Sequence, residues 1–334
     1  MNLYFLTPQD SALAARDASF LNSIRAELLG RSGISEAISP AEADAILIHE
    51  EFSFKEWRYI QKLLAAPVIG TYPHKTYTIN TDDIASGLLR GIYTSLPRNR
   101  FDPAIHRAAP YMWYQNELVL ERPTPTATAP QFLATWRGNV SSNTKLRRSM
   151  IRACNCSTSM LAEPTHSWFN QHTAEEKRRY IDVVRNGRFS LCPAGCAAVS
   201  WRIYESMALG VAPVIIADAF MPPRGPDWDS FSVRIPESSL HHLEAVLQHY
   251  SPEYKSMGAL ARSAWEEFFL PSRIASYYCD ALMELLCNRP QENSRGAELR
   301  RWQSFRMQWS NSWTILQRAL KRGADQLARL RPET

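Results

Sequence analysis

Short apolar runs alternate with stretches of helical periodicity along the first third of the chain. Runs of mostly apolar residues predict buried strands at residues 3–6, 45–49 and 67–72. Apolar residues at helical spacing predict helices over residues 20–29 and 55–65. This alternation of strands and helices is typical of a parallel sheet with helices on both faces.

The same alternation returns in the second half of the chain. Strands are predicted at residues 131–136, 158–161, 188–192, 211–216 and 231–235. Helices are predicted between and after them, at residues 144–153, 174–186, 201–209, 240–250, 252–268 and 273–287. We therefore expect an α/β protein built from two Rossmann-like domains.

A proline-rich segment separates the two halves. Residues 121–130 contain three prolines and no large apolar side chain, so they cannot form a core element and are predicted to be a linker. The expected organisation is a first domain, a linker, a second domain and a helical tail, over residues 1–122, 123–130, 131–290 and 291–334.

One strand, loop and helix concentrate the candidate chemistry. The loop after the strand at 188–192 consists of small residues around Gly195, which let backbone amides approach a ligand. Ser200 is predicted to cap the helix at 201–209, whose amino end favours phosphate. Arg202 lies in the first turn, where its planar guanidinium could bind two diphosphate oxygens.

Glu205 follows Arg202 at the i+3 position and therefore shares its helix face. A carboxylate one turn behind a phosphate site could accept hydrogen bonds from two ribose hydroxyls. The alternative is that Arg202 and Glu205 form an ordinary ion pair on a solvated helix face.

A longer motif surrounds these residues. It comprises Cys192-Pro193, Gly195, Ser200-Trp201-Arg202, Tyr204-Glu205, Gly210 and Pro213-Val214-Ile215-Ile216. In order and spacing this run resembles the exostosin family of glycosyltransferases. The likeness is strongest over residues 188–237 and extends weakly back to Arg137. Two positions depart from the family pattern, because Ala194 stands where a basic residue is usual and Ile203 where an aromatic residue is usual.

The resemblance implies a GT-B fold, in which two Rossmann-like domains face each other across a cleft. It implies inverting, metal-independent transfer from a nucleotide sugar, with a UDP-sugar as co-substrate and no other cofactor, to a glycan or lipid-linked glycan. The implied donor-binding residues are Arg137, Cys192, Gly195, Ser200, Arg202 and Glu205, and Arg202 is also expected to act in catalysis. Asp227-Trp228-Asp229 imitates a metal-binding DxD motif, but its match to the family's Asp-Trp explains it without a metal.

Two further arginines lie on the predicted helix at 144–153. Arg147 and Arg148 are candidates for the donor site because the helix follows the first strand of the second domain. Basic side chains on a helix are more often solvated, and we expect both to face solvent.

An inverting transfer also needs a general base on the acceptor side. Asp82 is our first choice among the acidic and imidazole groups beyond the first-domain strands. The others are His49, Glu50, Glu51 and Asp83. The alternative for Asp82 and Asp83 is that they cap a helix beginning near Ile84.

Charge and cysteine content narrow the functional class. The net charge is +5 and the pI is about 8.9, with no run of five or six like charges, so we expect no nucleic-acid partner. The six cysteines form no CxxC pair, which favours reduced thiols in a cytoplasmic protein. The apolar burst at residues 1–6 lacks a basic leader and is expected to be a strand rather than a signal peptide.

The C-terminal tail combines aromatic and basic residues at helical spacing. A basic, Trp-rich amphipathic helix suits an acidic membrane surface, which would place the protein peripherally at the inner face of a membrane. The alternative is that the helix packs on the protein itself or on a second subunit. Two functions are rivals to sugar transfer. The departure at Ala194 would suit a catalytically inactive nucleotide- or glycan-binding protein, and the basic tail would suit a membrane-associated scaffold.

Overall fold

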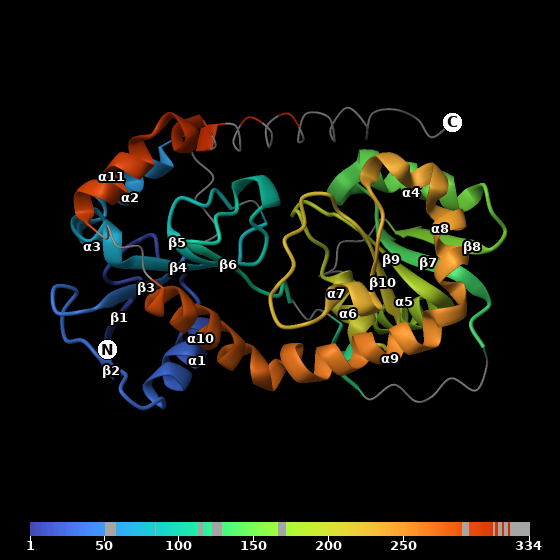
Figure 1. The fold of residues 1–334 in the computed structure, drawn as a ribbon, viewed down its shortest axis with the longest axis horizontal. Helices are drawn as coiled ribbons and strands as arrows, with labels where there is room; N and C mark the ends of the chain where they lie inside the picture. Colours follow the sequence, from blue (N-terminus) through green and yellow to red (C-terminus); the bar gives the residue numbers. More distant parts are fainter. Residues whose placement is uncertain are drawn as a thin grey trace. The chain divides into compact units, whose positions relative to one another are not determined.

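The computed structural model divides into two compact units, each described here by itself. Unit 1 comprises Met1–Ala109 and Ser272–Thr334, and unit 2 comprises Pro110–Pro271. Figure 1 traces the chain through both units. The residues that the structure describes are 1–50, 58–83, 85–112, 116–121, 129–165, 172–288, 294–309, 311, 312, 316 and 320.

Unit 1 contains a six-stranded parallel sheet. Its strand order is β2 (Ser35–Glu36), β1 (Asn2–Leu6), β3 (Ala45–His49), β4 (Thr76–Asn80), β5 (Arg90–Tyr93) and β6 (His106–Ala108). Its α-helices are α1 (Ser19–Leu29), α2 (Tyr59–Ala65), α3 (Pro67–Thr71), α10 (Pro271–Cys287) and α11 (Arg295–Gln303). The chain leaves β1 toward β2 and returns to β3 on the other side, so the strand order reverses between β1 and β3.

Both faces of this sheet are buried, which explains its continuous apolar strands. In β3, Ala45 and Leu47 point into a core shared with α1 and α10. The alternate residues Ile46 and Ile48 point into a second core, shared with α2, α3 and α11. Because successive side chains of a strand point to opposite faces of the sheet, β3 contributes residues to both cores.

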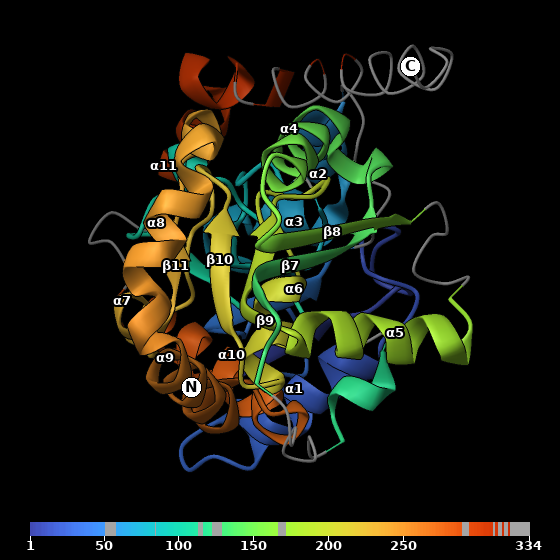
Figure 2. The ribbon, with the colours of Figure 1, turned by 90° about the vertical axis from the view of Figure 1, so that its right-hand side faces the viewer.

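Unit 2 contains a five-stranded parallel sheet. Its strand order is β11 (Val233–Arg234), β10 (Ala212–Ile216), β9 (Gly187–Pro193), β7 (Phe132–Asn139) and β8 (Met160–Thr165). Its α-helices are α4 (Thr144–Asn155), α5 (Ala174–Arg185), α6 (Arg202–Ala208), α7 (Trp228–Phe231), α8 (Leu243–Tyr250) and α9 (Tyr254–Ala264). Figure 2 shows α4 and α5 on opposite sides of β7 and β8. The two parallel sheets confirm the expected α/β class and the pair of Rossmann-like halves that a GT-B protein requires.

One predicted strand of unit 1 is wrong. Residues 67–72 form the short helix α3, because Pro67 occupies the first helical turn, where its missing N–H costs no hydrogen bond. The strand lies instead at β4, in which all five residues are buried. Two of the buried residues of β4 are threonines, Thr76 and Thr78, so β4 is not a continuous apolar run and is not predicted as a strand.

The compact units differ from the domain boundaries expected from the sequence. Helix α10 lies within the expected second domain, yet Tyr278, Leu282 and Leu286 pack in the core of unit 1. Trp302 of α11, in the expected tail, is also buried in unit 1. Most of the expected linker at 123–130 lies outside the described residues. The division between the units falls at Ala109 and Pro110.

We predict that Leu282→Ala selectively destabilises unit 1. The Leu282 side chain is fully buried against its sheet, so the substitution should lower the free energy of unfolding by about 2–5 kcal/mol. Hydrogen exchange should then accelerate at the amides of β1 and β3 but not at those of β7 and β9. Arg273→Ala, at an exposed position of the same helix, is the control. Faster exchange in β7 and β9 alone would place α10 with unit 2.

Candidate functional site

The candidate site of unit 2 lies where its strand order reverses. From β7 the chain proceeds to β8 on one side of the sheet, and β9 lies on the other side. In open α/β sheets the loops beyond the carboxyl ends of such strands form a crevice that binds ligands. Here those loops lead from β7 into α4 and from β9 into α6.

Arg202 lies beside these loops and is held against the end of β7. Its Nε donates a hydrogen bond to the carbonyl oxygen of Arg137 at 3.1 Å. Its guanidinium carbon lies 5.8 Å from the ring centroid of Trp136. A Cβ at Gly138 would overlap the guanidinium, so only glycine allows this close approach. The side chain is therefore fixed in place by the backbone of β7.

Arg147 of α4 meets the same tryptophan. Its guanidinium carbon lies 5.9 Å from the ring centroid of Trp136. Nη1 donates to the carbonyl of Asn139, and Nη2 donates to the carbonyl of Pro193 at 3.5 Å. Arg147 is buried, which contradicts our expectation that it faces solvent, whereas Arg148 is exposed as expected. Burial, followed by the nearby charge of Arg202, lowers the pKa of Arg147 well below its usual value.

No carboxylate in the described part of unit 2 forms an ion pair with either arginine. Among the described residues neither guanidinium forms an ion pair, and Nε of Arg147 has no hydrogen-bond partner. Burying a cation without a carboxylate carries a large desolvation cost. Arg147 is such a cation, and the half-buried Arg202 lies close to the same tryptophan, so the pair forms a strong candidate site for an anion with several oxygens.

The surrounding loops add polar groups. The side-chain oxygens of Ser142 and Ser200 are buried and have no hydrogen-bond partner among the described residues. A Cβ at Gly195 would lie 3.3 Å from Nη2 of Arg147 and 3.9 Å from the hydroxyl of Ser142. The loop after β9 therefore closes tightly over Arg147, as small residues at these positions permit.

Helix α6 begins differently from the prediction. Ser200 does not cap it with its side chain; the cap position is Trp201, and the carbonyl of Ser200 accepts from the amide of Ile203 at 3.1 Å. The helix has only seven residues, so its dipole is a small contribution. The positive charge at this end comes mainly from the arginine side chains.

Glu205 points inward from α6. It is buried, and Oε2 accepts a hydrogen bond from the hydroxyl of Tyr180 at 2.5 Å. Burial raises the pKa of Glu205, although the hydrogen bond from Tyr180 and the charge of Arg202 oppose this shift. The alternative of an ion pair with Arg202 on a solvated helix face is therefore wrong.

Two other predicted donor-site residues have structural partners. Nη1 of Arg137 pairs with Glu163 at 3.0 Å, while the backbone of Arg137 positions Arg202. Cys192 is fully buried in β9, and burial raises the pKa of its thiol to about 12. Cys192 is thus a neutral packing residue of unit 2 in this structure.

The predicted general bases cluster at the carboxyl ends of β3 and β4 in unit 1. Glu50 is buried and accepts hydrogen bonds from Tyr59, Thr78 and Asn80. Burial is the largest cause of its raised pKa, and the charge of Asp82 adds to the shift. The amide of Asp82 donates to Oδ1 of Asn80 at 3.0 Å, so Asn80 links the two acids.

The remaining acceptor-side candidates lie around these acids. Nε2 of His49 lies 3.2 Å from the hydroxyl of Thr81, and Asp83 is half-buried. Residues 85–88 are not helical, which contradicts the expected helix near Ile84. Glu51 and Ile84 themselves lie outside the described residues.

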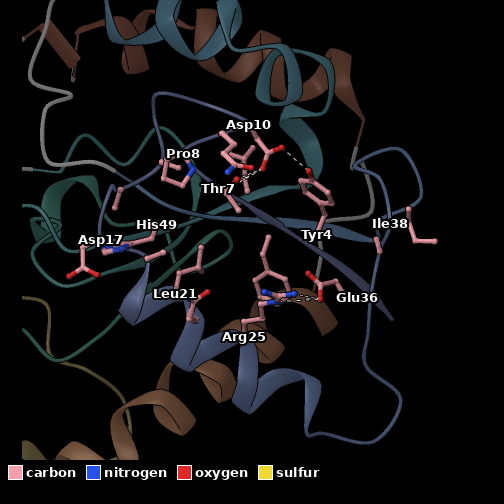
Figure 3. Close-up of a pocket in the computed structure, with 18 residues that line it drawn as sticks. Tyr4, Thr7, Pro8, Asp10, Asp17, Leu21, Arg25, Glu36, Ile38 and His49 are labelled. Carbon is pink, nitrogen blue, oxygen red and sulfur yellow. Dashed lines mark hydrogen bonds and ion pairs between the residues drawn. The ribbon is translucent and has the colours of Figure 1, made fainter.

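Unit 1 also contains a cavity of about 340 Å³ at its own reversal of strand order. Figure 3 shows its polar side chains around the end of β1. The hydroxyl of Tyr4 donates to Asp10 at 2.9 Å, and Arg25 pairs with Glu36 at 2.5 Å. Hydrogen bonds from Thr7 and Tyr4 lower the pKa of Asp10, although burial opposes this. Neither Glu50 nor Asp82 lines the cavity.

The DxD-like segment has a structural explanation. Trp228 is buried, and its indole N–H donates to the carbonyl of Pro223 at 2.8 Å. Asp227 precedes α7, and Asp229 is largely exposed. The two acids therefore flank a packed tryptophan.

Comparison with known proteins places these features in a family. Residues 39–250 match the model of the Exostosin GT47 domain. A "Probable glycosyltransferase" of Arabidopsis thaliana is 36% identical over 75 residues, 22% of this chain and 14% of the relative. A "Probable glucuronosyltransferase" of Oryza sativa subsp. japonica is 30% identical over 144 residues, 40% of this chain and 32% of the relative. The matched segments thus span less than a third of either relative.

A solved structure shows a more distant similarity. The crystal structure of an alpha1,3-fucosyltransferase is 13% identical, with a TM-score of 0.39, and the similarity covers 88% of this chain and 92% of that one.

The difference in burial among the six cysteines predicts which thiols react with an alkylating reagent. Burial raises the pKa of Cys154, Cys192 and Cys279 to about 12, whereas Cys156, Cys196 and Cys287 are exposed. Iodoacetamide at pH 8 should therefore alkylate the exposed set and spare the buried set, because the thiolate is the nucleophile. Peptide mass spectrometry measures this, with urea-unfolded protein as the control for full reactivity. Fast labelling of Cys192 in folded protein would contradict the buried position of β9.

Proposed function

This chain belongs to the exostosin GT47 family, and we propose that it transfers a sugar from a nucleotide-sugar donor to a hydroxyl of a glycan or lipid-linked glycan. We propose a UDP-sugar as donor, with inversion at the anomeric carbon and no requirement for a divalent metal. Relatives named as glucuronosyl- and xylosyltransferases support sugar transfer as the class of reaction. The chain is proposed to act in the cytoplasm, which six free cysteines support.

The observation that carries the proposal is the pair Arg147 and Arg202, whose guanidinium groups both lie close to the ring of Trp136. Their charges lack carboxylate partners among the described residues, and hydroxyls of Ser142 and Ser200 nearby lack hydrogen bonds. A diphosphate supplies the negative charge and the acceptor oxygens that this arrangement needs. We assign the diphosphate of the donor to this position.

Glu205 fits the nucleoside side of the same site. Tyr180 occupies one oxygen of its carboxylate, which leaves the other to accept a ribose hydroxyl. Arg137 acts as a positioning residue, because its carbonyl holds Arg202 while Glu163 neutralises its side chain.

The proposed chemistry follows from these charges. The acceptor oxygen attacks the anomeric carbon, the bond from that carbon to the diphosphate oxygen breaks, and the bonding electrons leave with the diphosphate. Arg147 and Arg202 stabilise this developing charge more than that of the bound donor, which lowers the barrier. The proton of the acceptor hydroxyl passes to a general base, which we propose is Asp82. Glu50 has its carboxylate oxygens bound by three donors and, through Asn80, positions Asp82.

Arg147→Met should separate binding from folding. Removing the charge leaves an apolar side chain of similar length, so the melting temperature should stay unchanged or rise, since a buried unpaired cation is costly. The Kd for UDP should increase about 10- to 100-fold. Arg148→Met, at the exposed neighbouring position, should change neither value. Calorimetry and thermal unfolding measure both; a lower melting temperature with unchanged UDP affinity would show that Arg147 is structural.

Asp82→Asn should retain donor binding and lose turnover. Loss of a general base typically lowers kcat by about 10²–10⁴-fold, while the Kd for UDP should not change. Asp83→Asn is the matched control. The readout is sugar release or transfer from a panel of UDP-, GDP- and CMP-sugars. If Asp83→Asn alone lost activity, the base would be reassigned; nucleotide binding without sugar release by the wild type would favour an inactive binding protein.

A further inference from the structure

The C-terminal segment begins with a helix that is firmly anchored to unit 1. Glu298 of α11 is fully buried and pairs with Nη2 of Arg90 at 3.0 Å. The indole N–H of Trp302 donates to Glu298 at 3.0 Å, and Trp302 itself packs in the unit 1 core. Arg301 also pairs with Glu298. The position of residue 303 relative to unit 1 is therefore well fixed.

The chain changes direction directly after this anchor. Ser304 has an extended backbone, with φ −59° and ψ 145°, which ends α11. Helical conformation resumes over residues 305–309 and is present at 311, 312, 316 and 320. The break separates α11 from a second helical segment, which contacts the same core through Met307.

Four of the described helical residues after this break carry exposed apolar side chains, which we call the apolar stripe: Phe305, Trp309, Leu316 and Leu320. Their exposed fractions are 82%, 58%, 41% and 61%. At 100° per residue the four positions fall within an arc of about 60° on one helix face. The rings of Phe305 and Trp309 stack with centroids 6.1 Å apart and an interplanar angle of 19°. Apolar residues this exposed and this aligned mark an interaction surface.

The charge of the segment identifies the partner. Residues 304–322, which follow α11, contain four Lys and Arg and no Asp or Glu. A second copy of the chain would bring four like charges against these four, which opposes self-association through the stripe. A bilayer rich in anionic lipid offers negative phosphates beside an apolar interior, and it complements both the charge and the stripe.

We infer that residues 305–320 bind the surface of an anionic lipid bilayer. The apolar stripe enters the boundary between headgroups and acyl chains, and the basic side chains meet lipid phosphates. Aromatic residues such as Phe305 and Trp309 suit this boundary. The anchor through Glu298 and Trp302 then holds unit 1 against the membrane. This inference does not depend on the proposed transferase activity.

The test uses the full-length protein and sedimentation with vesicles. Binding is expected with vesicles of phosphatidylcholine and phosphatidylglycerol, and at least about tenfold less with phosphatidylcholine alone. High salt should weaken it. The double substitution Phe305→Ser and Trp309→Ser should reduce binding at least about tenfold. Ile38→Ser, which removes the most exposed large apolar side chain of unit 1, is the control and should bind as wild type.

Three results would overturn the inference. The first is equal binding to neutral and anionic vesicles, and the second is unchanged binding by the double variant with a native melting temperature. The third is a dimer in light scattering that the double variant abolishes, which would assign the stripe to a second copy of the chain. UDP affinity, measured in parallel, should be the same in all these variants, so failure here is distinct from failure of the donor site.

Discussion

The arrangement of unit 2 depends on how it accommodates a buried guanidinium without a carboxylate. Arg147 is partly solvated by the carbonyls of Asn139 and Pro193, which end β7 and β9. These carbonyls are available only because the two strands are neighbours and parallel, so both end at one edge of the sheet. Carbonyl dipoles offset part of the desolvation cost but not the charge itself. The remaining charge is the reason that we propose a diphosphate at this edge of the sheet.

The same constraint explains the small residues of the site. Arg202 must lie close to β7 to share Trp136 with Arg147, and a side chain at Gly138 would prevent it. Gly195 similarly leaves room for Arg147 beneath the loop after β9. Neither Gly138 nor Gly195 has a positive φ. Glycine is therefore needed at these positions to let an arginine side chain lie against the backbone, and not to allow unusual backbone angles. The cations and the glycines are thus parts of one arrangement.

The sequence predicts the local elements of this site better than their surroundings. The strand, loop and helix around residues 187–208 can be recognised in the sequence, because two apolar runs lie on either side of a segment of small residues and an arginine. The prediction for Arg147 is wrong because part of its environment comes from Pro193, which is distant in the sequence. Tyr180 was missed for the same reason, since it reaches Glu205 from another helix. Likewise, the spacing of apolar residues predicts α10 but not which sheet it covers.

Glu205 lies on the same helix as Arg202 but forms no ion pair with it among the described residues. A carboxylate near Arg202 could neutralise it and leave no charge for a ligand. Tyr180 instead donates a hydrogen bond to one oxygen of Glu205, and burial raises the pKa of the carboxyl. Arg202 meanwhile is bound to the carbonyl of Arg137, a group that carries no net charge. Glu205 and Arg202 thus each have a neutral hydrogen-bond partner, which supports our proposal that the two arginines bind a diphosphate.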